Sequence, residues 1–221
     1  MVILYKYSMK VVVFDLDDTL YKEVDFLKSA FREIADTIGH PEVYNFMLKC
    51  YRDGENVFKT VIERYNLSYT VDQLLEIYRN HKPDITLSTS TVATLNALKN
   101  RGVTMGLITD GRSITQRNKI EALGLHRWID NDNILISEER GFGKPDERCY
   151  RHFMDCFPGA AFTYVGDNLN KDFITANRLG WKTICLLNDG QNIFKQDFSI
   201  SEEYRPKYLI NNLVEIKEML A

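Results

Sequence analysis

The chain has 221 residues, of which 44% are hydrophobic, and a formal net charge of −3 at pH 7. This length and apolar content are enough for a sizeable core, in one large domain or in one domain with an insertion. The sequence shows no basic stripe and no apolar run near the ~20 residues of a membrane helix, so we expect neither nucleic acid nor a membrane as a partner.

The first expected strand is the apolar run KVVVF at 10–14, and about 90 residues separate it from the next apolar run, far more than a normal crossover needs. Most of this stretch has helical periodicity. It includes an apolar face along 23–39, a proline at the start of 41–51 and a capping-box pattern before 70–79. The sequence therefore predicts a helical insertion directly after the first strand.

The rest of the chain alternates between helical patterns and short apolar runs. Helices are expected at 90–101, 113–123 and 170–179, each followed by a glycine that ends it, and 212–220 closes the chain. The further strands are expected at 103–109, 133–136, 162–165 and 182–187, with a weaker one at 207–210.

Strands that alternate with helices in this way form a parallel sheet covered on both faces. The predicted fold is α/β, with a Rossmann-like, doubly wound parallel sheet core and an inserted helical cap domain. We assign the core domain to 1–20 and 85–221 and the cap domain to 21–84. Ligands of open α/β sheets bind at the carboxyl ends of the strands, so the cap is expected to lie over the site as a lid.

The N-terminus and the cysteines indicate the compartment. The segment MVILYKYSMK has a very short apolar run and no small-residue cleavage site, which argues against a signal peptide. The cysteines form no Cys-x-x-Cys pair, as expected for reduced thiols. Both features favour a cytoplasmic location, whereas nothing in the sequence predicts an oligomeric state. The four cysteines are Cys50, Cys149, Cys156 and Cys185.

Acidic and polar residues follow the ends of the expected strands. Because parallel strands end at the same edge of a sheet, we expect these residues to converge on one spot. They are Asp15-Leu16-Asp17-Asp18-Thr19 after the first strand, Thr109-Asp110-Gly111 after the second, Gly143-Lys144-Pro145 after the third, and Gly166-Asp167 with Asp172 after the fourth.

This set of residues suits phosphoryl transfer. Several carboxylates at one point need a cation, and hard oxygen ligands suit Mg²⁺. One carboxylate can attack phosphorus and form an aspartyl-phosphate, while a second acid two residues away can protonate the leaving oxygen and then activate water. Lys144 supplies positive charge, and Thr109 with the amides after it can bind phosphate oxygens.

The same residues resemble a known family. Asp15-Leu16-Asp17-Asp18-Thr19-Leu20, Thr109, Lys144-Pro145 and Gly166-Asp167-x-x-x-x-Asp172 look like the four ordered motifs of the haloacid dehalogenase-like (HAD) hydrolase superfamily. The resemblance covers 10–20 and about 88–221. The insertion at 21–84 resembles the cap that many family members carry after the first motif.

The resemblance implies a role for each of these residues. Asp15 would be the nucleophile and Asp17 the general acid and base, while Thr109 and Lys144 hold the phosphate. Apart from the resemblance, Asp110 and Gly111 are candidate phosphate-binding residues through their backbone amides, although Asp110 could also only shape the turn with Gly111. Asp167 would bind Mg²⁺ together with Asp15 and the backbone carbonyl of Asp17. Asp172 would lie behind the metal or at an auxiliary metal site.

The acid at position 17 narrows the expected reaction. Family dehalogenases and phosphonate-cleaving members lack an acid there, so its presence favours phosphate esters. The usual glycine after that acid is replaced by Asp18. We expect a Mg²⁺-dependent phosphatase for a small phosphorylated metabolite, either a sugar phosphate or a nucleotide, that works through an aspartyl-phosphate.

Other interpretations stay open at this point. A phosphomutase similar to β-phosphoglucomutase would use the same scaffold and return the phosphoryl group to a sugar. A phospho-aspartate switch module would hold the phosphoryl group without turnover, although such modules are shorter and are phosphorylated after their third strand. Taken singly, Lys144 is also typical of a solvated loop, Thr109 of a strand, and Asp172 of a first helical turn.

Overall fold

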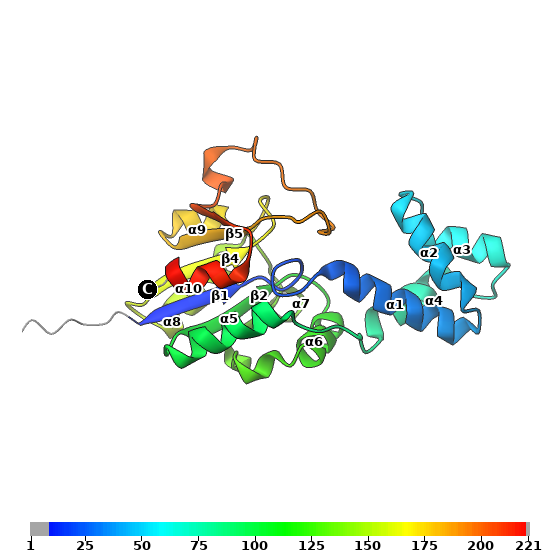
Figure 1. The fold of residues 1–221 in the computed structure, drawn as a ribbon, viewed down its shortest axis with the longest axis horizontal. Coiled ribbons are helices and arrows are strands. Elements are labelled where there is room, and N and C mark those ends of the chain that lie inside the picture. Colours follow the sequence, from blue (N-terminus) through cyan, green and yellow to red (C-terminus); the bar gives the residue numbers. More distant parts are fainter. Residues whose placement is uncertain (1–8, 220–221) are drawn as a thin grey trace, which may run out of the picture. The chain divides into compact units, whose positions relative to one another are not determined.

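The computed structural model describes residues 9–219 and contains a six-stranded sheet in the order β3-β2-β1-β4-β5-β6 (Figure 1). Every neighbouring pair of strands is parallel. All six strands expected from the sequence are confirmed. Their bounds are β1 Lys10–Phe14, β2 Thr104–Thr109, β3 Ile134–Ile136, β4 Ala161–Gly166, β5 Lys182–Leu186 and β6 Tyr208–Ile210.

Strand β1 lies in the middle of the sheet, between β2 and β4. The chain first adds β2 and β3 on one side of β1 and then returns to add β4, β5 and β6 on the other. Val13 therefore pairs with Gly106 of β2 and with Tyr164 of β4. The reversal makes the carboxyl ends of β1 and β4 a topological switch point, where loops diverge and leave a crevice for ligands.

Both faces of β1 are buried, as its continuous run of apolar residues requires. Val11 and Val13 join a core cluster with Tyr150 and Phe153 of helix α8 (Glu147–Cys156). Val12 and Phe14 are equally buried and point to the opposite face, because successive strand residues alternate. Helices α5 and α10 lie in front of the strands in Figure 1.

The helices expected at 90–101 and 113–123 are present within one residue of those bounds. The helix expected at 170–179 is wrong in its first half, because it begins only at Ile174. The Asp172 carboxylate accepts the backbone N–H groups of Asp167 and Asn168 and holds the preceding residues as a loop. The helices of this part are α5 Thr89–Asn100, α6 Ser113–Ala122, α7 Ser137–Arg140, α8 Glu147–Cys156, α9 Ile174–Arg178 and α10 Ile216–Met219.

Four short 3₁₀ turns lie among the described residues that follow β2. The closing helix expected at 212–220 consists of a 3₁₀ turn followed by α10, and residue 220 lies outside the described part. The segment 1–8, on which the expected absence of a signal peptide depends, also lies outside it. The 3₁₀ turns are η1 Leu125–Arg127, η2 Asn131–Asn133, η3 Glu202–Tyr204 and η4 Leu213–Glu215.

The insertion after β1 is helical, as the sequence predicts. The capping box before α4 is present: the Thr70 hydroxyl accepts from the Gln73 amide at 3.2 Å, and the Gln73 side chain accepts from the Thr70 amide at 2.8 Å. An apolar cluster that includes Phe31, Met47 and Leu74 forms its core. The helices are α1 Glu23–Ile38, α2 Glu42–Arg52, α3 Val57–Tyr65 and α4 Val71–Asn80.

The chain divides into two compact units. The helical unit comprises Glu23–Thr86 together with Ile114–Leu123, and the sheet belongs to the other unit. Within the helical unit, Thr115 donates to the Arg79 carbonyl and Asn118 to the His81 carbonyl, each at 3.0 Å. The division into a core at 1–20 and 85–221 and a cap at 21–84 stays a prediction.

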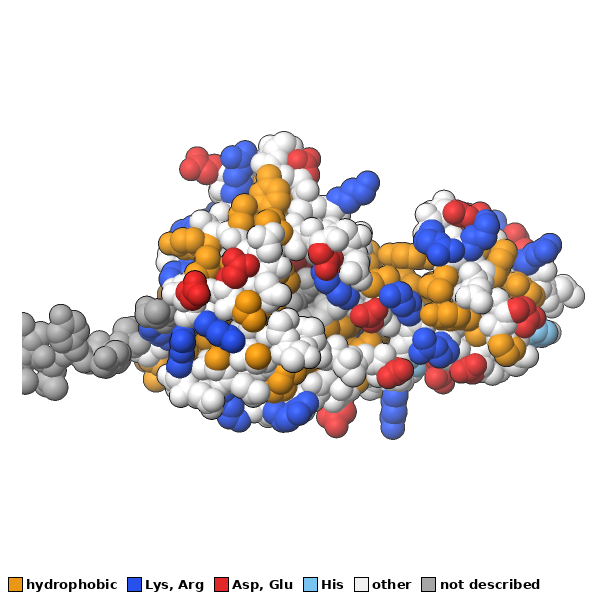
Figure 2. Space-filling model, in the orientation of Figure 1, with side chains coloured by type: hydrophobic (Ala, Val, Ile, Leu, Met, Phe, Trp, Pro, Cys, Tyr) orange, Lys and Arg blue, Asp and Glu red, His pale blue; other side chains and the backbone are white. Residues whose placement is uncertain are grey.

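The surface carries charges of both signs. On the face shown in Figure 2, basic and acidic side chains of the described residues are interspersed, in keeping with a net charge of −3. Among residues 9–219, no helix has the length and apolarity that crossing a bilayer demands. The four cysteines are all unpaired, and Cys156 is the exposed one.

Packing at Gly106 gives a test of the fold. A Cβ at this position would lie 2.3 Å from Cε1 of Phe153, whose side chain is fully buried. We expect Gly106→Ala to lower the free energy of unfolding by about 1–3 kcal/mol, because an overpacked core forces its neighbours out of place. Urea denaturation measures the change.

Phe153→Leu is the matching second variant, because it removes the ring atoms that the new methyl group meets. The double variant should be less destabilised than the sum of the two single variants. Additive effects would show that the ring of Phe153 does not restrict position 106.

Candidate active site

The loop after β1 carries the first acid group. The Asp15 amide donates to the Val165 carbonyl of β4 at 2.8 Å, which continues the strand pairing by one residue and fixes the start of the loop. Asp15 is 5% exposed, and its Oδ2 accepts a long 3.4 Å bond from the Thr19 hydroxyl. The Asp17 Oδ1 accepts from the Tyr21 hydroxyl at 2.6 Å. Asp15 is thus buried at the start of this loop, whereas Asp17 is partly exposed.

Asp18 has a structural role at the position where the family usually has glycine. Its φ of 57° lies in the left-handed region, which glycine adopts freely and aspartate tolerates better than most residues. Its carboxylate is buried and accepts from the Ile193 amide at 2.8 Å. The side chain therefore points toward the loop after β5 and fastens that loop to the acid loop.

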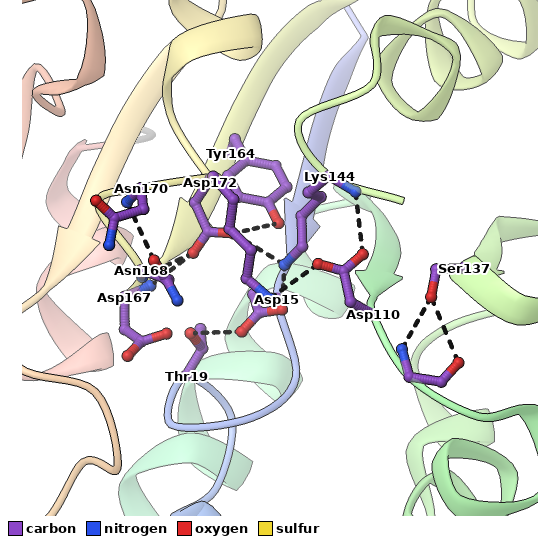
Figure 3. A network of polar contacts seen from close by, with 12 residues as sticks. Asp15, Thr19, Asp110, Ser137, Lys144, Tyr164, Asp167, Asn168, Asn170 and Asp172 are labelled. Atoms are coloured by element: carbon purple, nitrogen blue, oxygen red, sulfur yellow. Dashed lines mark hydrogen bonds and ion pairs between the residues drawn. The ribbon is translucent and has the colours of Figure 1, made fainter. Parts of the chain in front are cut away.

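Lys144 lies between two carboxylates. Its Nζ contacts Oδ1 of Asp15 in a short ion pair and Oδ1 of Asp172 at 2.8 Å (Figure 3). The side chains of Lys144 and Asp172 are fully buried, and that of Asp15 is 7% exposed. The chain thus brings three charges from the loops after β1, β3 and β4 into one water-poor contact.

Asp172 is held by groups from its own loop. Its Oδ2 accepts the backbone N–H of Asp167 at 3.1 Å and of Asn168 at 2.8 Å, and its Oδ1 accepts from the Tyr164 hydroxyl at 3.4 Å. The approach requires glycine at position 166, because a Cβ there would lie 2.4 Å from Oδ2 of Asp172. Both oxygens of Asp172 are thus engaged by protein groups.

Asp167 completes the acid cluster. One carboxylate oxygen each of Asp15, Asp167 and Asp172 lies within 4.8 Å of the others. Oδ2 of Asp167 accepts from the Asn192 side-chain amide at 2.9 Å, and its backbone carbonyl accepts from Gln196 at 2.8 Å. Oxygen donors on hard carboxylates fit Mg²⁺. Since Asp172 is occupied by protein donors, Asp15 and Asp167 are the side chains best placed to bind a metal.

Burial and repulsion between carboxylates raise the pKa values of the acids in this cluster. Burial raises the pKa of Asp15 to about 6, and Asp172 adds to the rise against the opposing charge of Lys144. Burial also raises the pKa of Asp167 to about 8, with further increases from Asp15 and Asp172. For Lys144, burial acts to lower the pKa, but Asp15 and Asp172 outweigh it and hold the pKa well above its usual value. When Asp15 and Asp167 are both ionised, they need a nearby cation to offset their repulsion, and a divalent metal can supply that charge.

The loop after β2 lies on the other side of Lys144. Thr109 ends β2 and is buried. Asp110 accepts from the Lys144 amide at 3.0 Å through Oδ1 and from Nζ of Lys171 at 2.8 Å through Oδ2. The Gly111 amide, which the sequence offers as a phosphate donor, donates to the Ser137 hydroxyl at 2.9 Å. In the structure this amide is engaged by a protein acceptor.

Five of the expected residues converge at the carboxyl ends of the strands, as the sequence predicts. Asp15, Lys144, Asp167 and Asp172 are in one contact network, and Asp110 joins it through Lys144. Three carboxylates on that network were expected at the metal together with Asp17: Asp15 and Asp167 as direct ligands, and Asp172 behind the metal or at an auxiliary site. The carboxylate of Asp17 instead contacts Tyr21, and its expected metal contact is through the backbone carbonyl.

Several polar residues around the site were not predicted. Lys171 lies between Asp167 and Asp172, at a position for which the motif specifies no residue type. Asn192 lies 25 residues after Asp167, in a loop without a recognisable motif. Its amide oxygen accepts from Nζ of Lys22 at 2.9 Å, so the loop after β5 contacts both acid loops. Only the folded chain reveals these contacts.

Comparison with known proteins identifies the family. The family model described as haloacid dehalogenase-like hydrolase matches residues 12–186. The chain belongs to the haloacid dehalogenase-like hydrolases. The match begins in β1 and ends with β5, so it includes every strand end from which the site is built.

Two curated relatives extend the comparison along the chain. The glyceraldehyde 3-phosphate phosphatase of Methanocaldococcus jannaschii is 30% identical over 96% of this chain and 97% of its own. The enzyme of the same name from Methanothermobacter thermautotrophicus is 28% identical over 96% of this chain and 100% of its own. This hydrolase is a phosphatase that acts on small phosphate monoesters.

A solved structure shows the same fold. The HAD-hydrolase YfnB from Bacillus subtilis, crystallised bound to magnesium, superposes with a TM-score of 0.70 at 20% identity and covers 96% of this chain and 99% of its own. The doubly wound parallel sheet predicted from the sequence is therefore the fold of this family.

The raised pKa of Asp167 leads to a prediction about metal-free protein. A carboxyl whose pKa is about 8 in the folded chain and near 3.9 when unfolded stabilises the fold below the lower value. That stability is lost as the pH rises toward 8, by at most about 1.4 kcal/mol per pH unit. In EDTA, Asp167→Asn should become progressively more stable than the wild type between pH 5 and pH 8.

Urea denaturation at three pH values measures the difference, with the exposed Asp155→Asn as the surface control. A difference between Asp167→Asn and the wild type that stays constant with pH would mean that the folded chain holds Asp167 ionised without a metal.

Proposed function

We propose that this phosphatase uses Mg²⁺ and transfers the phosphoryl group of a small phosphorylated metabolite to Asp15 before water releases it. The observation that supports this most strongly is the contact network of Asp15, Lys144 and Asp172 with Asp167 beside it. A buried carboxylate held by a lysine and next to a second metal-binding carboxylate is suited to nucleophilic attack on phosphorus.

The chain's own groups prepare Asp15 for attack. Lys144 holds one carboxylate oxygen and favours the ionised form, which is the form that attacks. Asp172 fixes the lysine from the other side through a 2.8 Å ion pair, so the ammonium stays directed at the reacting centre. Thr109 and Lys144 are assigned to the phosphoryl oxygens, where negative charge develops during transfer.

Asp17 is assigned the proton transfers. In the first half-reaction it donates a proton to the leaving oxygen, and in the second it takes one from the attacking water. The Tyr21 hydroxyl at 2.6 Å holds one of its oxygens and orients the side chain. Asp17 is half-buried, which leaves it accessible to an alcohol or a water.

Mg²⁺ would be held by Asp15, Asp167 and the backbone carbonyl of Asp17. When bound, it would neutralise the repulsion between an anionic nucleophile and an anionic substrate. Asn192 and Gln196 hold Asp167 in place through its Oδ2 and its backbone carbonyl. Asp172 would position Lys144 and the loop of Asp167 without binding the metal itself.

The acid at position 17 and the relatives support a choice of substrate class. Among sugar phosphates and nucleotides, we favour a triose phosphate. Both relatives reported above are named as phosphatases of glyceraldehyde 3-phosphate, and each covers nearly the whole of this chain.

Replacement of the nucleophile gives the decisive test. With Mg²⁺ present, the wild type should release phosphate from glyceraldehyde 3-phosphate faster than from nucleoside monophosphates or phosphoserine. Asp15→Asn keeps the shape of the side chain but removes the attacking charge, so we expect a loss of at least about 10³-fold in kcat. EDTA should abolish release by the wild type. Malachite-green detection of phosphate measures all three.

Asp155→Asn, at an exposed position, is the matched control and should retain wild-type turnover. Full Mg²⁺-dependent turnover by Asp15→Asn would refute the covalent mechanism. An isomerised sugar phosphate with little free phosphate would instead indicate a mutase, and a stable phospho-aspartate without release would indicate a switch module.

A further inference from the structure

Lys144 has little capacity left for a substrate. An ammonium has three N–H donors, and two of those of Lys144 are directed at Asp15 and Asp172. Its side chain is fully buried. A phosphate monoester carries nearly two negative charges near neutral pH. Lys144 therefore has one N–H donor left, and three phosphoryl oxygens need several donors.

A second lysine lies at the same network. Lys171 immediately precedes Asp172, and its Nζ donates to Oδ2 of Asp110 at 2.8 Å. The other oxygen of Asp110 accepts the backbone N–H of Lys144 at 3.0 Å. Asp110, which lies next to Lys144 in Figure 3, therefore holds the backbone of Lys144 with one oxygen and the ammonium of Lys171 with the other.

The exposure and the bonding of Lys171 differ from those of Lys144. Its side chain is 32% exposed, and its partner Asp110 is 23% exposed. Within residues 9–219, Asp110 is the one acceptor on which its ammonium is placed, so two N–H donors remain for a ligand. Its charge also acts on the nucleophile, because it is one of the charges that lower the pKa of Asp15.

A purely structural role explains this arrangement poorly. A partly exposed ion pair contributes only about 0–1 kcal/mol to stability. The network already holds four carboxylates, those of Asp15, Asp110, Asp167 and Asp172, against the ammonium groups of Lys144 and Lys171. A dianionic substrate adds to this surplus of negative charge, so an accessible cation has more value as a ligand for phosphate than as a partner for Asp110 alone.

We propose that Lys171 is a second phosphate-binding residue, which donates to a non-bridging oxygen of the phosphoryl group while Asp110 holds its ammonium in place. The inference rests on the proposed function, since it assumes that Asp15 is the reacting centre. Lys171 would lower the energy of the bound dianion together with Lys144, which also holds Asp15.

The test compares two substitutions at the same position. Lys171→Met removes the charge and keeps most of the length of the side chain, and Lys171→Arg restores the charge. Isothermal titration of inorganic phosphate into Mg²⁺-loaded protein gives Kd, and steady-state kinetics give kcat and KM. We expect Lys171→Met to raise both Kd for phosphate and KM by about 10-fold, the effect of one lost charge-assisted hydrogen bond. Lys171→Arg should recover most of the loss.

Two further variants separate binding from structure. Lys195→Met, at an exposed lysine of the same unit, is the matched control and should bind phosphate as the wild type does. Asp110→Asn keeps a side-chain oxygen for the Lys144 amide but loses the anionic partner that holds the Lys171 ammonium, so it should raise the Kd for phosphate by less than Lys171→Met does. If the ion pair were only structural, both substitutions would lower the melting temperature and neither would change the Kd for phosphate.

The outcomes distinguish this inference from the proposed function. A wild type that releases no phosphate from any ester would refute the proposed function, whatever Lys171 does. An active wild type with unchanged phosphate Kd in Lys171→Met would refute the role of Lys171 alone. A raised KM with unchanged phosphate Kd would also refute it, because the lysine would then contact the leaving group.

Discussion

A lysine ammonium held between two carboxylates, all three shielded from water, is the contact around which the loops at the carboxyl end of this sheet are arranged. Removing one partner from a buried ion pair leaves a charge without compensation and destabilises by about 3–5 kcal/mol. Lys144, Asp15 and Asp172 therefore have to be assembled together. Two backbone amides satisfy the remaining oxygen of Asp172. The geometry of the loops after β1, β3 and β4 depends on that assembly.

The sheet supplies the place where such a contact can form. Strand β1 lies between β2 and β4, because the chain adds strands first on one side of β1 and then on the other. The loops after β1 and β4 therefore diverge at the carboxyl ends of these strands. Glycine is required at two positions where loops approach closely. A Cβ at Gly166 would meet Asp172 at 2.4 Å, and one at Gly143 would meet Asp110 at 2.5 Å. Fold and site are thus linked through backbone positions that carry no functional group.

The excess of carboxylates destabilises the buried site, but it also suits the site to bind a cation. Asp15 and Asp167 have raised pKa values because they are buried and because neighbouring carboxylates add to the rise. A hydrolase of phosphate monoesters needs to bring an anionic substrate to an anionic nucleophile, so it gains from a site that recruits a cation. The loop after β5 supports this arrangement, since Asn192 and the Ile193 amide hold Asp167 and Asp18 from outside the motifs.

The sequence by itself determined the six strands, the helical insertion and the four strand-end motifs, because apolar periodicity and motif spacing are local properties of the chain. It also indicated the family, which comparison confirmed. The sequence did not predict the late start of α9. The carboxylate of Asp172 accepts two backbone amides there and overrides the helical pattern. Only the tertiary structure decided where Asp18 points and which residues surround Asp167 and Asp110. Those contacts join residues far apart in sequence, such as Asp18 with Ile193 and Asp110 with Lys171, and neither periodicity nor spacing carries information about them.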